Sequence, residues 1–253
     1  MDRLENLKNI IMYLMADNRV SHRIPSTLEE RQRMMRALMN VWEPRLIAED
    51  FLTMQDAELQ MQREDKGVVE ISDITPKTSD IRLWQGDITR LKVEAIVNAA
   101  NAQALGCWAP LHNCIDNCIH SAAGIQLRKK CADKMQGLLL ATGDAFITQG
   151  YNLPAKHVIH TVGPIIPDGI PTKEQEEQLA QCYRSCLDLA EQNGLESIAF
   201  CCISTGVFHF PNEQAAKIAI ETVKSYPRHA LKTIVFNVFL DKDRDNYQQL
   251  LRA

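Results

Sequence analysis

The spacing of apolar residues divides the chain into two regions of different periodicity. In the first 65 residues, apolar side chains recur at the spacing of one helical face, as in Leu4, Ile10, Ile11 and Leu14. This pattern predicts helices and no strand. The three predicted helices lie in "MDRLENLKNIIMYLMADN", in "TLEERQRMMRALMNVW", which opens on a Ser-Thr cap and ends before a proline, and in "DFLTMQDAELQMQRED".

From about residue 80, short runs of β-branched and aromatic residues alternate with helical patterns. Strands are predicted in "IRLWQGD", "EAIVNAA", "DAFITQG", "KHVIHTVG", "SIAFCCIST" and "KTIVFNVFL". Helical patterns occupy residues 113–123, 173–192, 212–225 and about 243–252. This alternation predicts an α/β fold, a three-layer sandwich around a mainly parallel sheet. We therefore expect a helical extension at residues 1–75, packed on an α/β domain at residues 76–253.

Composition and charge favour some classes of protein and disfavour others. The chain of 253 residues is 45% hydrophobic and 24% charged, as in ordinary globular proteins. Its net charge of −4 and the lack of a long Lys/Arg run disfavour a nucleic-acid partner. No apolar stretch approaches the roughly 18–20 residues that span a membrane, and no signal-cleavage site follows the first helix, so we expect a cytoplasmic protein. The eight cysteines are then expected to be reduced, as core, metal-binding or catalytic groups.

Three loops follow predicted strands, where ligands bind in sheets of this kind. They are "GDIT" (86–89), "NAAN" (98–101) and "STGVF" (204–208). The third is small, contains glycine and leads into a helix, so its backbone N–H groups can cradle a phosphate. Such a sequence is also common in turns that bind nothing.

Four polar side chains near these loops are candidates for ligand contact. Asp87 can accept a hydrogen bond from a ligand, or cap its own turn. Asn98 and Asn101 end a buried strand and must be hydrogen-bonded; we expect Asn98 to hold the loop and Asn101 to face the substrate. Asp116, in the first turns of a helix, can orient a water or bind a ribose hydroxyl, or only complement the helix dipole.

The stretch "GCWAPLHNCIDNC" concentrates three thiols and an imidazole. Cys107, His112 and Cys114 have the spacing C-x4-H-x-C and are residue types that zinc accepts. Three protein ligands leave a fourth position open, as in catalytic sites, whereas Cys118 or His120, one turn further along the helix, would close a structural site. No common zinc-finger spacing matches, so core cysteines with a capping histidine are the alternative.

Four segments together resemble the macrodomain family, which binds ADP-ribose and often hydrolyses it from proteins. They are "GDITRLKVEAIVNAAN", "IDNCIHSAAG", "GDAFITQGYNLPAKHVIHTVGP" and "CISTGVFHFP", in this order over residues 82–211, and "IVFNVFLDKD" fits the last strand. Many hydrolytic macrodomains carry glycines where this chain has "GCWAPLHNC". That departure, with "IPSTLEERQRMMRALMNVWEP" and "FLTMQDAEL", is similar to the zinc-dependent subclass of microbial macrodomains.

The resemblance implies a fold, a reaction and a cofactor. The fold is a three-layer α/β/α macrodomain sandwich with a mixed, mainly parallel sheet after an N-terminal helical extension. The reaction is hydrolysis of mono-ADP-ribose from a modified protein, on aspartate or glutamate esters, with ADP-ribose as product. One Zn²⁺ per chain is expected on Cys107, His112 and Cys114. The alternatives are a reader that binds ADP-ribose without cleaving it, which the presence of Asn101 and Asp116 disfavours, and a structural zinc protein.

The resemblance also assigns individual roles. Asp87 is expected to hold the adenine amino group, and Phe239 or Leu240 to flank the adenine. Asn101 is expected to face the distal ribose and Asp116 to lie near the scissile bond, and these two are the expected catalytic residues. The segment 204–208 should wrap the diphosphate. The expected ADP-ribose-binding residues are Asp87, Ile88, Asn101, Ser204, Thr205, Gly206, Val207 and Phe208, the last covering the distal ribose.

Overall fold

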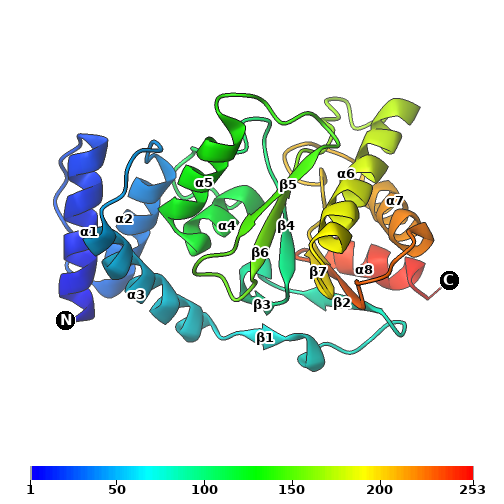
Figure 1. Ribbon diagram of the computed structural model, residues 1–253, viewed down its shortest axis with the longest axis horizontal. Coiled ribbons are helices and arrows are strands. Elements are labelled where there is room, and N and C mark those ends of the chain that lie inside the picture. The colour runs from blue at the N-terminus through cyan, green and yellow to red at the C-terminus, as the bar shows by residue number, and fades with distance from the viewer. Residues whose placement is uncertain (1, 253) are drawn as a thin grey trace.

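A computed structural model describes residues 2–252 (Figure 1). The helices are α1 (Arg3–Asn18), α2 (Leu28–Asn40), α3 (Glu49–Lys66), α4 (Ile115–Ala123), α5 (Ile125–Met135), α6 (Lys173–Gln192), α7 (Asn212–Ser225) and α8 (Asp241–Leu250). The strands are β1 (Val69–Glu70), β2 (Ile81–Gln85), β3 (Leu91–Lys92), β4 (Ala95–Ala99), β5 (Ala145–Gln149), β6 (His157–Thr161), β7 (Ser197–Phe200) and β8 (Thr233–Val238). Over the described residues, none of the helices combines the length and apolar character that crossing a membrane requires.

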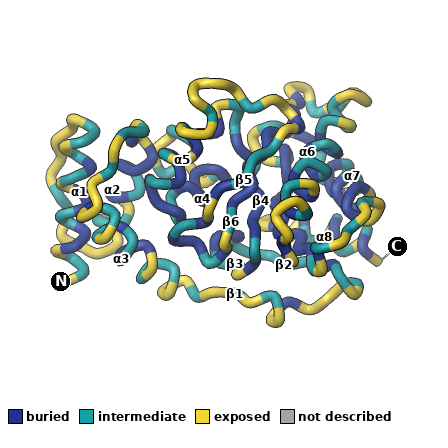
Figure 2. Tube along the Cα trace, in the orientation of Figure 1, coloured by how far each residue is buried: buried dark blue, intermediate teal, exposed yellow. Residues whose placement is uncertain are grey.

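Six strands form one sheet in the order β2-β8-β7-β4-β6-β5. All neighbours are parallel except β5, which runs antiparallel to β6 at the edge. Helices α4 and α5 cover one face, and α6, α7 and α8 cover the other (Figure 1). The central strands β4 and β7 are therefore buried almost throughout, as their unbroken apolar runs require (Figure 2). The expected three-layer sandwich with a mixed, mainly parallel sheet is confirmed.

Two element boundaries differ from the pattern of the sequence. The sequence pattern predicts no separate helix over Ile125–Met135, where the structure has α5. Gly124 alone separates α5 from α4. Its φ of +103° would strain another residue, and a side chain there would also meet Gln126, so this break requires glycine. The strand predicted in "SIAFCCIST" ends at Phe200, since the chain turns away before the left-handed Ser204 (φ 65°).

The extension forms a second hydrophobic core beside the sandwich. Helices α1, α2 and α3 bury Leu7, Ile10, Met35 and Phe51 against one another and against Trp42, which follows α2, with further apolar side chains around them. Ile125 of α5 joins this core, and α2 and α3 pack on α4, so the extension lies against the α4–α5 layer (Figure 1). The expectation of helices packed on the main domain is confirmed, while the division at residues 75 and 76 remains a prediction.

Gly150, in the turn between β5 and β6, tests how closely the sheet edge is packed. A Cβ atom at this position would lie 2.0 Å from the carbonyl oxygen of Ala155, which is backbone and cannot rotate away. We expect Gly150→Ala to lower the free energy of unfolding in urea by about 1–3 kcal/mol, the usual cost of overpacking. Gly206→Ala is the control, because no atom lies within 4 Å of its added Cβ. Equal stability of the two variants would contradict the close approach at Gly150.

Candidate active site

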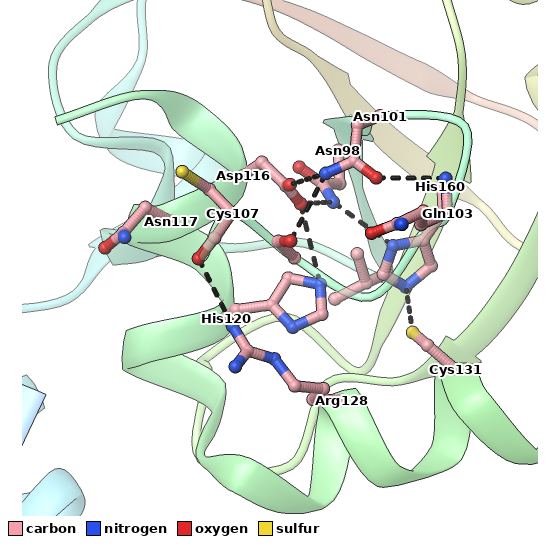
Figure 3. Close-up of polar contacts among 12 residues, drawn as sticks. Asn98, Asn101, Gln103, Cys107, Asp116, Asn117, His120, Arg128, Cys131 and His160 are labelled. Carbon is pink, nitrogen blue, oxygen red and sulfur yellow. Dashed lines mark hydrogen bonds and ion pairs between the residues drawn. The ribbon is translucent and has the colours of Figure 1, made fainter. Parts of the chain in front are cut away.

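A buried carboxylate lies where the end of β4 meets the start of α4 (Figure 3). Asp116, in the first turn of α4, is 4% exposed. The Asn98 amide donates to its Oδ1 at 2.8 Å, and the Asn101 amide donates to its Oδ2 at 3.3 Å. An unpaired buried carboxylate is costly, so these two donors from the "NAAN" segment are what allows Asp116 to sit here. The structure thus brings together Asn101 and Asp116, the two expected catalytic residues.

The two asparagines divide their work differently from the expectation. Asn101 holds the loop: its Nδ2 donates to the Gly106 carbonyl at 3.2 Å, and its Oδ1 accepts from the Gln103 amide at 3.0 Å. Asn98 is fully buried. Its amide donates one hydrogen bond to Asp116 and another to His160 Nδ1, the latter at 3.2 Å. The prediction that Asn98 holds the loop is therefore wrong. Asn101 remains half-buried, and its contact with substrate stays a prediction.

His160 fixes the orientation of Asn98. Since the Asn98 amide donates to Nδ1, that nitrogen accepts, and the imidazole proton lies on Nε2. Nε2 is 3.0 Å from the Thr148 hydroxyl, which in turn donates to the Val158 carbonyl at 3.3 Å. Phe146 stacks on the ring, with centroids 4.8 Å apart. A continuous chain of hydrogen bonds therefore leads from strands β5 and β6 to the carboxylate of Asp116.

Charges in this region follow from burial. Burial raises the pKa of Asp116 to about 6, although the Asn98 hydrogen bond and the Arg128 charge act in the opposite direction. Burial lowers the pKa of His160 to about 3, and burial together with His160 and Arg128 holds the pKa of His120 well below its ordinary value. Neutral imidazoles therefore lie behind the carboxylate at neutral pH.

The loop before α4 gathers three metal-binding side chains. Donor atoms of Cys107, His112 and Cys114 lie within 4.8 Å of one another, and Cys107 Sγ is 3.6 Å from His112 Nδ1. Zinc bonds to sulfur and nitrogen are about 2.0–2.3 Å long, so donors at such separations need only small shifts to surround one ion. Burial, with a smaller contribution from Cys107, raises the pKa of the Cys114 thiol to about 12. The donor types and their spacing fit zinc, which deprotonates its thiol ligands when it binds.

The possible fourth ligands lie elsewhere. Cys118 Sγ faces the Arg36 guanidinium at 3.8 Å, while His120 belongs to a different, fully buried group with Cys131 and His160. In that second group His160 Nε2 already pairs with Thr148. We interpret it as packing behind Asp116, since His120 Nε2 lies 3.6 Å from the Asp116 carboxylate.

The residues expected at the adenine end lie at the ends of β2 and β8. Asp87 Oδ1 accepts from the amide and hydroxyl of Thr89, at 3.0 and 2.6 Å, and Oδ2 faces Lys66 Nζ at 3.3 Å. Burial raises the pKa of Asp87, but these partners outweigh it and hold the pKa below its ordinary value. The Ile88 side chain is buried in the main core, so a contact with adenine falls to its main chain. Phe239 is 71% exposed at the end of β8.

The segment 204–208 forms a tight loop after β7. Phe210 N donates to the Ser204 carbonyl at 3.0 Å, and His209 N donates to the Gly206 carbonyl at 3.0 Å. Within residues 2–252, no hydrogen bond engages the backbone N–H groups of Gly206, Val207 and Phe208. Consecutive free amides in a turn suit an anion such as a diphosphate.

Comparison with known proteins identifies the fold family. The model of the Macro domain family matches residues 97–219. A protein of Treponema medium named "Protein-ADP-ribose hydrolase" is 48% identical over 96% of this chain and 96% of its own length. The chain belongs to the macrodomain family. A mutant of the Oceanobacillus iheyensis macrodomain with ADPR is 38% identical over 71% of this chain and 96% of its own, with a TM-score of 0.62. The Trypanosoma brucei macrodomain in complex with ADP-ribose is 31% identical over 81% of this chain and 91% of its own, with a TM-score of 0.65.

Sequence reasoning missed the role of His160 in this macrodomain. The residue stands in "KHVIHTVG", among buried β-branched neighbours on β6. A histidine in such a run must find hydrogen-bond partners, and that requirement was the available signal. Its partners Asn98 and Thr148 are on other strands, so the sequence alone could not name them.

The Asn98 contact yields a test of how Asp116 is held. We expect Asn98→Ser to lower turnover of a mono-ADP-ribosylated protein by about 10- to 100-fold, because a hydrogen bond to a charged group is worth about 1.5–3 kcal/mol. ADP-ribose affinity, measured by calorimetry, should change much less. Asn193→Ser, at the exposed end of α6, is the control. Unchanged turnover in a folded Asn98→Ser protein would show that Asp116 does not depend on this amide.

Proposed function

We propose that this macrodomain is a zinc-dependent hydrolase that removes mono-ADP-ribose from modified aspartate or glutamate side chains. The observation that carries the proposal is the buried Asp116, held at both oxygens, two residues after a three-donor cysteine–histidine loop. The protein-ADP-ribose hydrolase of Treponema medium, similar over nearly the whole chain, and the macrodomains bound to ADP-ribose support it.

We infer that Cys107, His112 and Cys114 hold one zinc ion. Two thiolates and an imidazole are a donor set typical of catalytic zinc, with one position left for substrate or water. Cys118 and His120 face other partners, which supports an open site over a closed structural one. When bound, zinc supplies Lewis-acid polarisation of an oxygen beside it.

The remaining roles fall to the chain's own groups. The free amides of 206–208 bind the diphosphate, Asp87 accepts from the adenine amino group, and Asn101 positions the distal ribose. Phe208 covers that ribose. Asp116 orients the attacking water and takes its proton. Water adds across the ester, so the products are free ADP-ribose and the restored side-chain carboxylate.

A reader module is the competing function, since binding of ADP-ribose needs no catalytic group. The environment of Asp116 favours hydrolysis. Its carboxylate is buried, held by two amides and backed by the neutral His160, an arrangement that binding of a sugar does not require. Pre-oriented groups of this kind are typical of sites that perform proton transfer.

Single cysteine variants separate the metal site from the other thiols. We expect Cys107→Ala and Cys114→Ala to reduce zinc, measured by mass spectrometry of native protein, from one ion per chain to none. Turnover of mono-ADP-ribosylated protein should be lost with it. Cys118→Ala is the matched control, because Cys118 lies on α4, one turn after Cys114. This variant should keep both its zinc ion and its turnover. Loss of zinc from Cys118→Ala would indicate a closed structural site, and full turnover by zinc-free protein would overturn the metal's catalytic role.

Two aspartate variants separate catalysis from binding. We expect Asp116→Asn to lower turnover by about 10²- to 10⁴-fold, the usual contribution of a general base, with ADP-ribose affinity within a few-fold of wild type. Asp87→Asn should show the opposite pattern, with weaker ADP-ribose binding and a raised KM but a smaller loss of kcat. Turnover by Asp116→Asn at the wild-type rate would exclude it as the base. A wild-type protein that binds ADP-ribose and cleaves no substrate would be a reader.

A further inference from the structure

The extension holds the metal-binding loop by its backbone. Arg36, on α2, donates from Nη2 to the His112 carbonyl at 2.7 Å. Asn40, at the end of α2 and 1% exposed, accepts from the Leu111 amide at 2.9 Å. Leu111 has a left-handed backbone (φ 59°), which a leucine adopts only when its surroundings enforce it. Helix α2 therefore fixes the backbone of His112 and of the strained residue before it.

Helix α4 forms hydrogen bonds with both α2 and the loop. Asn117 of α4 accepts at Oδ1 from Arg36 Nη2 at 2.9 Å, and donates from Nδ2 to the Ala109 carbonyl at 2.9 Å. Asn40 also donates to the Ser121 hydroxyl at 3.0 Å. The loop, α2 and α4 thus share one set of hydrogen bonds, with Arg36 between them.

Arg128, on α5, binds the other end of the loop at Cys107 (Figure 3). Its Nη2 donates to the Cys107 carbonyl at 3.2 Å, and its guanidinium stacks on the Trp108 ring, 4.1 Å from the centroid. Its Nη1 donates to the Met39 and Asn40 carbonyls at the C-terminal end of α2, and to the Trp42 carbonyl just beyond that end. Such terminal carbonyls lack partners within a helix.

We propose that the N-terminal extension is part of the metal site. Arg36 and Asn40 of α2, together with Arg128 of α5 as the link between α2 and Cys107, are positioning residues that hold Cys107 and His112 at ligand spacing. The inference rests on the proposed zinc site. The His112 end of the ligand loop is held by α2 directly and the Cys107 end through Arg128 of α5, so the order of α2 and the metal affinity are coupled. Coupling of this kind is reciprocal: α2 strengthens zinc binding, and zinc binding orders α2 by the same factor.

Zinc affinity measures the coupling directly. In competition with a chromophoric chelator, we expect Arg36→Met to bind zinc about 10-fold more weakly than wild type, or weaker still, as groups that hold ligand residues are worth about 10- to 100-fold. Arg33→Met, on the same helix with its side chain exposed, should match wild type. Equal affinity of wild type and Arg36→Met would overturn the inference and leave the zinc site standing. No zinc on the wild-type protein would overturn both.

Hydrogen–deuterium exchange of the wild-type chain tests the reciprocal effect and needs no variant. Zinc should slow exchange in α2 (Leu28–Asn40) by about 10-fold, while α7 (Asn212–Ser225), on the far face of the sheet, stays unchanged. In Arg36→Met the slowing should be lost, even though a folded α2 remains. Zinc that slows exchange only within the ligand loop would show that the extension merely covers α4.

Discussion

The site depends on keeping the carboxylate of Asp116 buried. Removing an ion from water costs several kcal/mol unless other groups replace its hydration, and here two amides from one strand end do so. This requirement explains why β4 must end in "NAAN" beside the first turn of α4. It also explains the neutral imidazole of His160, which accepts from Asn98 and so leaves the other amide hydrogen for the carboxylate.

Close packing behind the carboxylate sets the path of the metal-binding loop. A Cβ atom on Gly106 would lie 2.8 Å from the His120 ring, and Gly106 has φ of +82°, so only glycine lets the chain pass there. The Gly106 carbonyl accepts a hydrogen bond from the Asn101 side-chain amide, and Cys107 is the next residue. The geometry that orients Asn101 toward Asp116 therefore also places the first metal-binding thiol.

Features with local causes could be predicted from the sequence, and features with distant causes could not. The strands follow from unbroken apolar runs, and the three metal-binding residues lie within one loop, so their spacing was visible. Helix α5 was hidden because Gly124 breaks the pattern after α4. The role of Asn98 in holding Asp116 depends on His160, on another strand, and the support of His112 comes from Arg36, 76 residues away. Partners at such separations become visible only in the folded chain.

The extension contacts both the proposed adenine site and the proposed metal site, but the two sets of contacts differ in strength. At the adenine end, Lys66 pairs with Asp87, but both side chains are partly exposed, and such pairs are worth about 0–1 kcal/mol. An adenine amino group can replace that partner at little cost. At the metal end, the buried Asn40 of α2 binds the Leu111 backbone, and the buried Arg128 of α5 joins the Cys107 carbonyl to the end of α2. The contact of the extension with Asp87 can thus be replaced by substrate, whereas its contacts with the ligand loop keep that loop in shape.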